Sequence, residues 1–322
     1  MKHGRSKLAS VVAFALGITA MASAAPSYAQ EFPTKPITVI IPFGPGGTTD
    51  VMMRLMQKSL SDALGVPIVV ENRAGASGAI GMGAVARANP DGYTLGMTAV
   101  GQIATIPAIR KTPYTPDSFD HICSTYDVPL MMQVPKDSQF KTFGDIIKFA
   151  KDNPGSLTYG SSGAGTVLHL SMLMLADQAK LDMLHVPYKS SGDMVAGLMG
   201  KQIMAFTETP TMSAKYGLRG LALFSEKRLK EYPDVPTTAE LGYPTRVSVW
   251  GGLVAPRGLP EAVRKKLEAA CFKAVNNDEY RSRAETYDTP LVYKDAATFK
   301  SFAKAEFERY SEIVKKNNLK ID

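Results

Sequence analysis

Two kinds of hydrophobic pattern follow one another along most of the chain. Short apolar runs rich in Val and Ile are typical of buried strands, and apolar residues spaced three or four positions apart are typical of amphipathic helices. The first pattern predicts strands at 36–42, 66–70, 93–98, 128–134, 157–160, 183–187, 203–206, 219–224 and 248–254. The second predicts helices at 48–64, 78–88, 142–152, 165–180, 191–200, 237–241, 260–276 and 296–317. This alternation predicts an α/β fold with mainly parallel sheets.

The first strand runs into a glycine-rich break before the first helix begins. The break reads Gly-Pro-Gly-Gly-Thr-Thr, and Thr48 or Thr49 is expected to cap the helix, with Asp50 in its first turn. Unpaired N–H groups at a helix N-terminus make an anion site, so this segment is a candidate binding loop. A tight turn that binds nothing is an equally good interpretation of this segment alone. The candidate residues are Phe43, Gly44, Gly46, Gly47, Thr48 and Thr49.

A second break repeats this design in the middle of the chain. A short strand reaches Gly160, a loop of small residues follows, and a helix with His169 in its first turn comes next. Ligands of open α/β sheets bind outside the carboxyl ends of the strands. The matched pair therefore predicts two domains that each offer a helix N-terminus to one shared cleft. The candidates in the second loop are Ser161, Ser162, Gly163, Ala164, Gly165 and Thr166.

The first 29 residues have the features of a secretory signal peptide. Lys2, Arg5 and Lys7 precede a mostly apolar segment, 8–22, and Ser27-Tyr28-Ala29 has the small residues of a cleavage site. We therefore expect a soluble periplasmic protein cut after Ala29, since no later run is long and apolar enough for a membrane helix. The 322 residues, 45% of them hydrophobic, suffice for two domains.

Charge and cysteine content narrow the function only slightly. Removing the three basic residues of the signal changes the net charge from +7 to about +4, and the remaining basic residues are scattered. The chain lacks the clustered basic residues of a nucleic-acid-binding protein, whereas its mild positive net charge suits a small acidic ligand. Export permits a disulfide between Cys123 and Cys271. Because Cys271 lies on an apolar helical face, however, we expect two buried, unpaired thiols.

Catalytic and metal-binding patterns are incomplete. The sequence "GMGAVA" at 81–86 has no strand directly before it and no acidic residue at the ribose-binding distance, so it does not predict dinucleotide binding. The sequence "GSSGAG" at 160–165 lacks the second glycine of a nucleophile elbow, and no His follows His185, which argues against an esterase. We expect no enzyme, metal or cofactor. Tyr188 and Lys189 face either the cleft or a solvated turn.

A series of long motifs runs through the whole mature chain. It comprises "PTKPITVIIPFGPGGTTD", "VVENRAGASGAIG", "ARANPDGYTL", "LTYGSSGAGTVLHL", "LHVPYKSSGDMVAGLMGKQI", "YPDVPTTAELGY" and "AEFERYSEIVKKNNLKID". These motifs resemble those of the Bug family, the TctC-like solute-binding proteins of tripartite tricarboxylate transporters. The resemblance implies a periplasmic-binding-protein, or Venus flytrap, fold with two α/β domains around a ligand cleft. The extended segments "DVPLMMQV" and "VSVWGGLVAP" predict domain I at 31–127 and 252–322, and domain II at 128–251.

The resemblance also implies how the cleft works. A ligand carboxylate is held between the two glycine loops, and the segment with Arg73, Ala74 and Gly75 lines the cleft; Glu208 is expected near it. The ligand is a di- or tricarboxylate, or an aromatic or amino-acid-type anion. The protein, expected to be a monomer, delivers it to large and small integral membrane subunits or, alternatively, reports it to a sensor kinase. Met204, where the family commonly has an acidic residue, and "YKSSGD" depart from the family pattern and prevent transfer of one particular ligand.

Overall fold

The computed structural model describes residues 32–289 and 291–316. Residues 1–34 form one unit, of which only 32–34 are described, and residues 35–322 form a second unit that holds all the described helices and strands. The predicted signal peptide at 1–29 lies outside the described residues. Within the described ranges, no helix combines the length and apolar character needed to cross a membrane.

The first sheet is built around β1 (Ile37–Ile41), the β-branched run that the sequence predicts as a buried strand. It pairs in parallel with β2 (Ile68–Asn72) on one side and with β3 (Thr94–Ala99) on the other. The long strand β10 (Ser248–Pro256) runs antiparallel to both β3 and β4 (Phe119–Pro129). The order is therefore β2-β1-β3-β10-β4. The longer helices of this domain are α2 (Thr48–Leu64), α3 (Ala79–Ala86), α9 (Glu261–Val275), α10 (Asp278–Glu285) and α11 (Ala296–Lys316).

The second sheet has the order β7-β6-β8-β5-β9. Its central part repeats the design of the first, because β6 (Leu157–Ser161) pairs in parallel with β7 (Met183–Pro187) and β8 (Ala205–Glu208). The strand β5 (Met131–Val134) runs antiparallel to β8 and to β9 (Arg219–Leu223). The helices of this domain are α5 (Phe143–Asp152), α6 (Val167–Ala179), α7 (Ser191–Met199) and α8 (Pro210–Tyr216).

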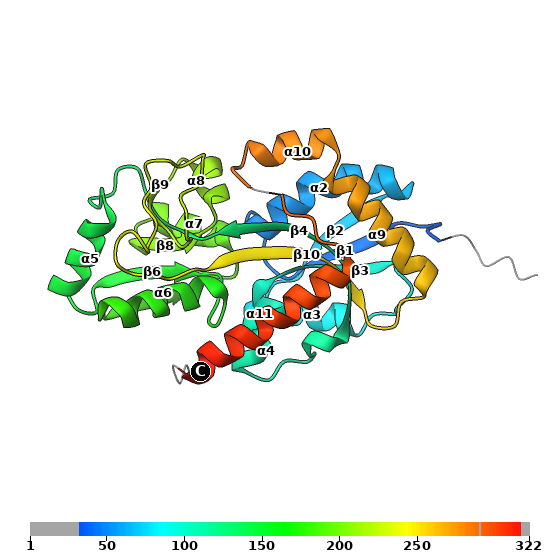
Figure 1. The fold of residues 1–322 in the computed structure, drawn as a ribbon, viewed down its shortest axis with the longest axis horizontal. Helices are drawn as coiled ribbons and strands as arrows, with labels where there is room; N and C mark the ends of the chain where they lie inside the picture. The colour runs from blue at the N-terminus through cyan, green and yellow to red at the C-terminus, as the bar shows by residue number, and fades with distance from the viewer. Residues whose placement is uncertain (1–31, 290, 317–322) are drawn as a thin grey trace, which may run out of the picture. The chain divides into compact units, whose positions relative to one another are not determined.

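The predicted two-domain α/β fold is confirmed, but the expectation of mainly parallel sheets is wrong. Each sheet has both parallel and antiparallel pairs, because the chain passes between the sheets along β4 and β10 and these strands run in opposite directions. In Figure 1 they lie side by side, with α5 to α8 towards one end and α2, α3 and α9 towards the other. The domain boundaries at 127/128 and 251/252 stay a prediction.

Individual elements agree with the pattern except where polar residues or prolines interrupt it. The predicted helix at 237–241 is wrong: Pro236 precedes it, Gly242 adopts a φ of +86°, and the segment forms an isolated bridge at Thr237 followed by a turn. Most of β4 was not predicted, because Asp120, Ser124 and Thr125 break its apolar run. Other elements not predicted are α8, α10, the short α4 (Ile106–Ile109), the π-helical turn η2 (Gly101–Thr105) and the 3₁₀ turns η1 (Ala76–Gly78) and η3 (Pro116–Ser118).

The expectation of two unpaired thiols is also wrong. Cys123 in β4 and Cys271 in α9 form a disulfide that joins positions 148 residues apart in sequence. Both residues are completely buried, as the apolar face of α9 indicates. The sequence does not reveal that α9 packs on β4, which brings the two sulfur atoms together.

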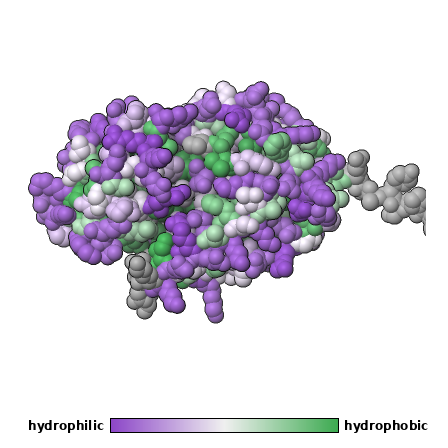
Figure 2. All heavy atoms as spheres, in the orientation of Figure 1, coloured by the Kyte–Doolittle hydropathy of each residue, from purple (hydrophilic) through white to green (hydrophobic). Residues whose placement is uncertain are grey.

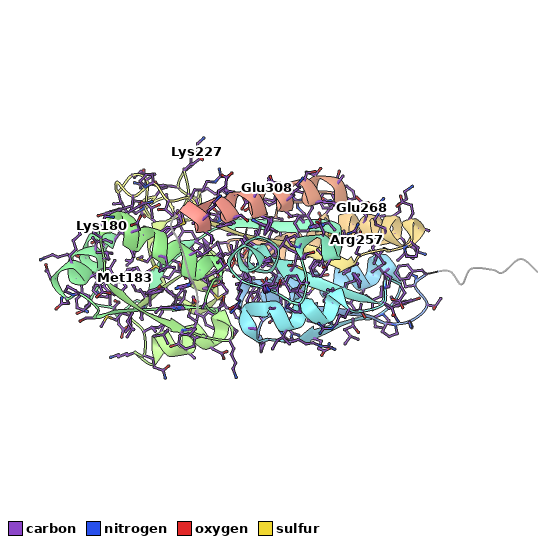
Figure 3. All side chains as sticks on the ribbon, turned by 90° about the horizontal axis from the view of Figure 1, so that it is seen from below. Lys180, Met183, Lys227, Arg257, Glu268 and Glu308 are labelled. Carbon is purple, nitrogen blue, oxygen red and sulfur yellow. A yellow bond between two sulfur atoms is a disulfide. The ribbon has the colours of Figure 1, made fainter. Side chains whose placement is uncertain are left out.

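The surface carries many scattered charges. Hydrophilic residues cover most of the face shown in Figure 2, and hydrophobic residues are visible only in separate patches. Lys180, Lys227 and Glu308, labelled in Figure 3, are exposed side chains from different parts of the chain.

Candidate functional site

The loop between β1 and α2 carries a side-chain anchor for its own backbone. Gly46 adopts a φ of +92°, and its N–H donates to Asp50 Oδ2 over 2.9 Å. The Asp50 carboxylate also accepts hydrogen bonds from Arg54 Nε and from Asn72 Nδ2. Gly47, not Thr48 or Thr49, is the N-cap of α2, and no side chain caps it. The helix N-terminus is therefore open, as an anion site requires.

The loop between β6 and α6 has a matching anchor of different chemistry. Gly163 and Gly165 have φ values of +119° and +80°, so both adopt a left-handed backbone that favours glycine. The Gly165 N–H donates to His169 Nδ1 over 3.1 Å, and Thr166 Oγ1 donates to the Gly163 carbonyl over 2.8 Å. Thr166 is the N-cap of α6 but makes no side-chain cap bond, so this helix start is open as well.

A cavity of about 30 Å³ lies where the two helix starts meet. It has room for about one water molecule, so any larger ligand requires the walls to separate. The first domain supplies Phe43, Gly47, Thr48, Thr49, Asp50, Ala99, Val100, Gly101 and Val249; the second supplies Ser162, Thr166, Val167, Leu168, Ser191 and Glu208.

Seven predicted site residues are thus brought together around this cavity: Phe43, Gly47, Thr48, Thr49, Ser162, Thr166 and Glu208. The others do not line it: Gly44, Gly46, Arg73, Ala74, Gly75, Ser161, Gly163, Ala164, Gly165, His169 and Tyr188. Sequence reasoning did not place Ser191 or the 99–101 segment at the site. Ser191 follows the N-cap of α7, and a search for further helix starts after strands would have found it.

Glu208 occupies the wall of the cavity between the two domains. Its Oε1 accepts a hydrogen bond from Ser191 Oγ over 2.7 Å, and its Oε2 accepts one from Thr48 Oγ1 over 3.0 Å. The backbone N–H of Thr209 also donates to Oε2. The side chain is only 3% exposed, and this burial raises the pKa of Glu208, while the hydrogen bonds act in the opposite direction.

Each loop also reaches across to the other domain. The Gly44 N–H donates to the Lys189 carbonyl over 3.4 Å, so Lys189 meets the first loop through its backbone. From the first domain, Thr105 Oγ1 donates to the Gly165 carbonyl over 2.7 Å and Ser77 Oγ to the Ala164 carbonyl over 2.8 Å. These contacts hold the loops around the cavity in a closed arrangement.

Arg73 and Tyr188 make contacts away from the cavity. The guanidinium of Arg73 pairs with Glu71, and this partner lowers the pKa of the Glu71 carboxyl; both side chains are over 40% exposed. Tyr188 donates its hydroxyl proton to Gln202 Oε1 over 3.3 Å. Ser77, two residues after Gly75, makes the contact with the second domain, through the Ala164 carbonyl.

Two neighbouring histidines form hydrogen bonds with the second loop. The rings of His169 and His185 stack with centroids 3.9 Å apart, and Ser161 Oγ lies 2.7 Å from His185 Nε2. Burial lowers the pKa of His169 to about 3 and that of His185 to about 4, so both imidazoles are neutral at pH 7. Ser161 is completely buried, so it has no open face for a substrate. The arrangement fits a loop support rather than an exposed nucleophile.

Comparisons with known proteins agree with this architecture. Residues 52–319 match the model of the tripartite tricarboxylate transporter family receptor. The chain is 34% identical to a UPF0065 protein of Cupriavidus necator, covering 95% of this chain and 94% of the relative. It is 33% identical to the protein BugT of Bordetella pertussis, covering 92% of this chain and 94% of BugT.

Solved structures give the same answer for the fold. A periplasmic transporter superposes with a TM-score of 0.86 at 36% identity, covering 90% of this chain and all of that structure. MatC from Rhodopseudomonas palustris with bound malate has a TM-score of 0.84 at 28% identity, covering 88% of this chain and all of MatC. An R. palustris protein with adipate has a TM-score of 0.82 at 29% identity, covering 88% of this chain and 98% of that protein. With two α/β domains around a cavity and these relatives over nearly its full length, the chain belongs to the family of tripartite tricarboxylate transporter receptors.

Proposed function

We propose that this chain captures a small carboxylate between the loops 43–49 and 161–166 and closes its two domains around it. One observation supports the proposal above the others: the open N-termini of α2 and α6 meet at one cavity from opposite domains. Relatives of similar fold carry malate and adipate, both of which are dicarboxylates.

The donors at the cavity suit an anion. Backbone N–H groups at the two helix starts and the hydroxyl of Ser162 border the same space, together with Thr48 and Thr166, whose hydroxyls donate to Glu208 and to the Gly163 carbonyl. Hydrogen bonds to a charged acceptor contribute about 1.5–3 kcal/mol each, so a few of them suffice for micromolar affinity. Two loops from separate domains also make binding depend on closure.

Closure requires a hinge, and β4 and β10 are the segments placed to provide it. They pair along their whole length, and their register shifts between Gly251 and Gly252 and again between Leu253 and Val254. Such irregularities bend a strand. Because the cavity holds about one water molecule in this closed arrangement, we infer that the ligand enters an open form.

We further propose that the protein works in the periplasm, after removal of residues 1–29, and has no catalytic activity. Its partners are then the large and small membrane subunits of a tripartite tricarboxylate transporter. Reporting to a sensor kinase is the alternative. Deleting the gene separates the two roles, because a transport receptor is needed for ligand uptake, whereas a sensor is needed only for the transcriptional response.

A thermal-shift screen of mono-, di- and tricarboxylates tests the binding function. A ligand at 100 times its dissociation constant stabilises the folded state by about 2.7 kcal/mol, which raises the melting temperature by several degrees. Calorimetry then compares each hit with its amide, which keeps the shape but loses the charge. Equal affinity for acid and amide, or a screen without any stabilising carboxylate, contradicts the proposal.

A further inference from the structure

Glu208 presents a buried carboxylate at the place where the ligand is proposed to bind. Its partners are the hydroxyls of Thr48 and Ser191 and the backbone N–H of Thr209, all of which donate hydrogen bonds without carrying charge. Thr48 itself also shares a 2.6 Å hydrogen bond with Thr209 Oγ1. The Glu208 carboxylate therefore accepts hydrogen bonds from donors that an incoming anion would use.

No cation balances Glu208 among the residues that the structure describes. Its pKa is affected by burial and by its hydrogen bonds, with no contribution from a Lys, Arg or His side chain. Lys215 reaches the first loop, but it is exposed and its Nζ donates to the Gly46 carbonyl over 3.3 Å. Two further ionisable groups in the surroundings are Tyr126 on β4, whose pKa is raised mainly by burial and further by Glu208, and Asp50 on α2. Neither supplies positive charge.

Asp50 provides an internal comparison, because it lines the same cavity and is also buried. Its Oδ1 pairs with Arg54 Nε at 2.9 Å, and Asn72 and Gly46 donate to the same carboxylate. Its charge is therefore matched from within its own domain. Buried carboxylates are normally paired in this way, so Glu208 is the one acidic group of the cavity that lacks a counter-ion.

We infer that Glu208 selects carboxylates that also carry a protonated amine, with the ammonium group against Glu208 and the carboxylate at the glycine loops. This assignment rests on the proposed carboxylate-binding function and specifies its ligand class. An ammonium group supplies three donors and a positive charge, so it replaces the hydroxyls of Thr48 and Ser191 as partners of Glu208. Those hydroxyls then become available to the ligand carboxylate.

A ligand without the amine meets an unfavourable arrangement. Thr48 begins α2 and touches Glu208 directly, so a carboxylate bound at this helix start lies close to the Glu208 charge. Two like charges at such a separation in a water-poor site repel each other strongly. A plain dicarboxylate therefore binds only if Glu208 first takes up a proton.

Calorimetry with matched ligands at pH 7.5 tests the inference. Succinate, malate and aspartate differ only in carrying hydrogen, hydroxyl or ammonium on one carbon, and adipate and 2-aminoadipate form a second pair. We expect the amino acid of the best-fitting length to bind at least tenfold more tightly than its plain or hydroxylated counterpart. We also expect the preference to shrink to less than threefold in Glu208→Gln, which keeps the size and an acceptor oxygen.

Asp177→Asn serves as the matched control, since it removes one exposed carboxylate from the same domain far from the cavity lining. It should leave the preference unchanged, and melting curves of all variants check that each is folded. If Glu208→Gln does not fold, the ligand series on the unmodified protein still decides the question.

The outcomes are distinct. Equal or tighter binding of the plain acids by the unmodified protein overturns the inference while leaving carboxylate capture intact. Plain-acid binding that is as strong at pH 7.5 as at lower pH also overturns it, because the Glu208 charge then does not oppose the plain acids. If none of these acids binds but the thermal-shift screen finds another carboxylate without an amine, the inference alone fails. If no carboxylate binds at all, the proposed function fails, and the inference fails with it.

Discussion

The β1–α2 loop and the β6–α6 loop follow one plan and use their glycines differently. In each, the residue before the helix N-cap donates its N–H to a side chain four positions later, Gly46 to Asp50 and Gly165 to His169. In the second loop, the positive φ values of Gly163 and Gly165 require glycine for the turn itself. In the first, Gly47 has an ordinary extended backbone with a φ of −80°.

What restricts Gly47 is the opposite domain. A Cβ atom there would lie 3.2 Å from Ser191 Cβ, and one at Gly44 would lie 3.0 Å from Ser190 Cβ. In the first loop, Gly44 and Gly47 are therefore restricted by the approach of α7, whereas Gly46, with a φ of +92°, and Gly163 and Gly165 in the second loop are restricted by their left-handed backbone. The two glycine-rich loops therefore meet two different constraints: close approach of the other domain on closure, and a backbone conformation that the fold requires.

The largest expected effect is on ligand binding by Gly47→Val. The added side chain fits the local backbone but collides with Ser191 when the domains close. We expect carboxylate affinity, measured by calorimetry, to fall at least about 100-fold, equivalent to roughly 2.7 kcal/mol. The unliganded protein should unfold within about 0.5 kcal/mol of the parent.

Gly144→Val is the control for this change, since a Cβ there meets only Thr142 Oγ1 at 3.6 Å. It should not affect binding. Unchanged affinity in Gly47→Val would show that closure does not bring Ser191 against this loop during binding.

The next effect concerns folding, and Gly163→Ala should show it. Its φ of +119° strains any L-residue, and the new Cβ would lie 2.6 Å from Ser77 Oγ. We expect the free energy of unfolding in urea to fall by about 1–3 kcal/mol. Gly47→Ala should lose about 0.5 kcal/mol or less, so equal losses in the two variants would erase the distinction between the loops.

A third effect follows from the imidazole anchor of the second loop. The pKa of His169 is about 3 in the folded protein because of burial, whereas an unfolded histidine titrates near 6.5. The unfolded chain therefore binds an extra proton as pH falls through 6.5 towards 3, and stability declines over that window. We expect His169→Gln to reduce the loss of unfolding free energy between pH 7.5 and pH 5 by about 1–2 kcal/mol.

His121 separates this titration from the loop itself. It is buried in the first domain against Phe299, and burial with neighbouring charge lowers its pKa to about 4. His121→Leu should flatten the pH dependence of stability similarly but leave carboxylate affinity unchanged. His169→Leu should weaken binding, because leucine offers no acceptor to the Gly165 N–H. Identical binding in both variants would contradict a role for this anchor.

The smallest expected effect is the difference between removing the hydroxyl of Thr48 and removing that of Thr166. Thr48 bonds across to Glu208 and Thr209, whereas Thr166 bonds to the Gly163 carbonyl within its own loop. Removing either hydroxyl should cost about 1 kcal/mol. We expect Thr166→Ala to lower the free energy of unfolding in urea, and Thr48→Ala to lower mainly the ligand affinity. A loss of affinity in Thr166→Ala and of stability in Thr48→Ala would contradict this difference.

The sequence predicts the repeated local designs well and the contacts between distant segments poorly. The strands β1 and β6 and the helices α2 and α6 follow from their apolar spacing, and the loops between them follow from glycines and hydroxyl residues. Spacing along one segment does not say what faces it. The approach of Ser191 to Gly47 and the Cys123–Cys271 bond both join elements whose packing no local pattern encodes.

The same limit explains the errors in the predicted elements. The strand β4 contains the polar residues Asp120, Ser124 and Thr125. It pairs with β10 and contacts the helices α9 and α11, which lie far from it in the sequence. A rule based on apolar runs misses such a strand. The domain boundaries depend on these crossing strands as well, so they too stay a prediction.

The Cys123–Cys271 disulfide makes part of the chain into a covalent ring. All strands of the second sheet, from β5 to β9, lie between the two cysteines in sequence. A single proteolytic cut anywhere in that stretch therefore opens the ring without releasing a fragment. Under non-reducing electrophoresis the nicked protein keeps its full mass, and a reducing agent is needed to separate the two pieces.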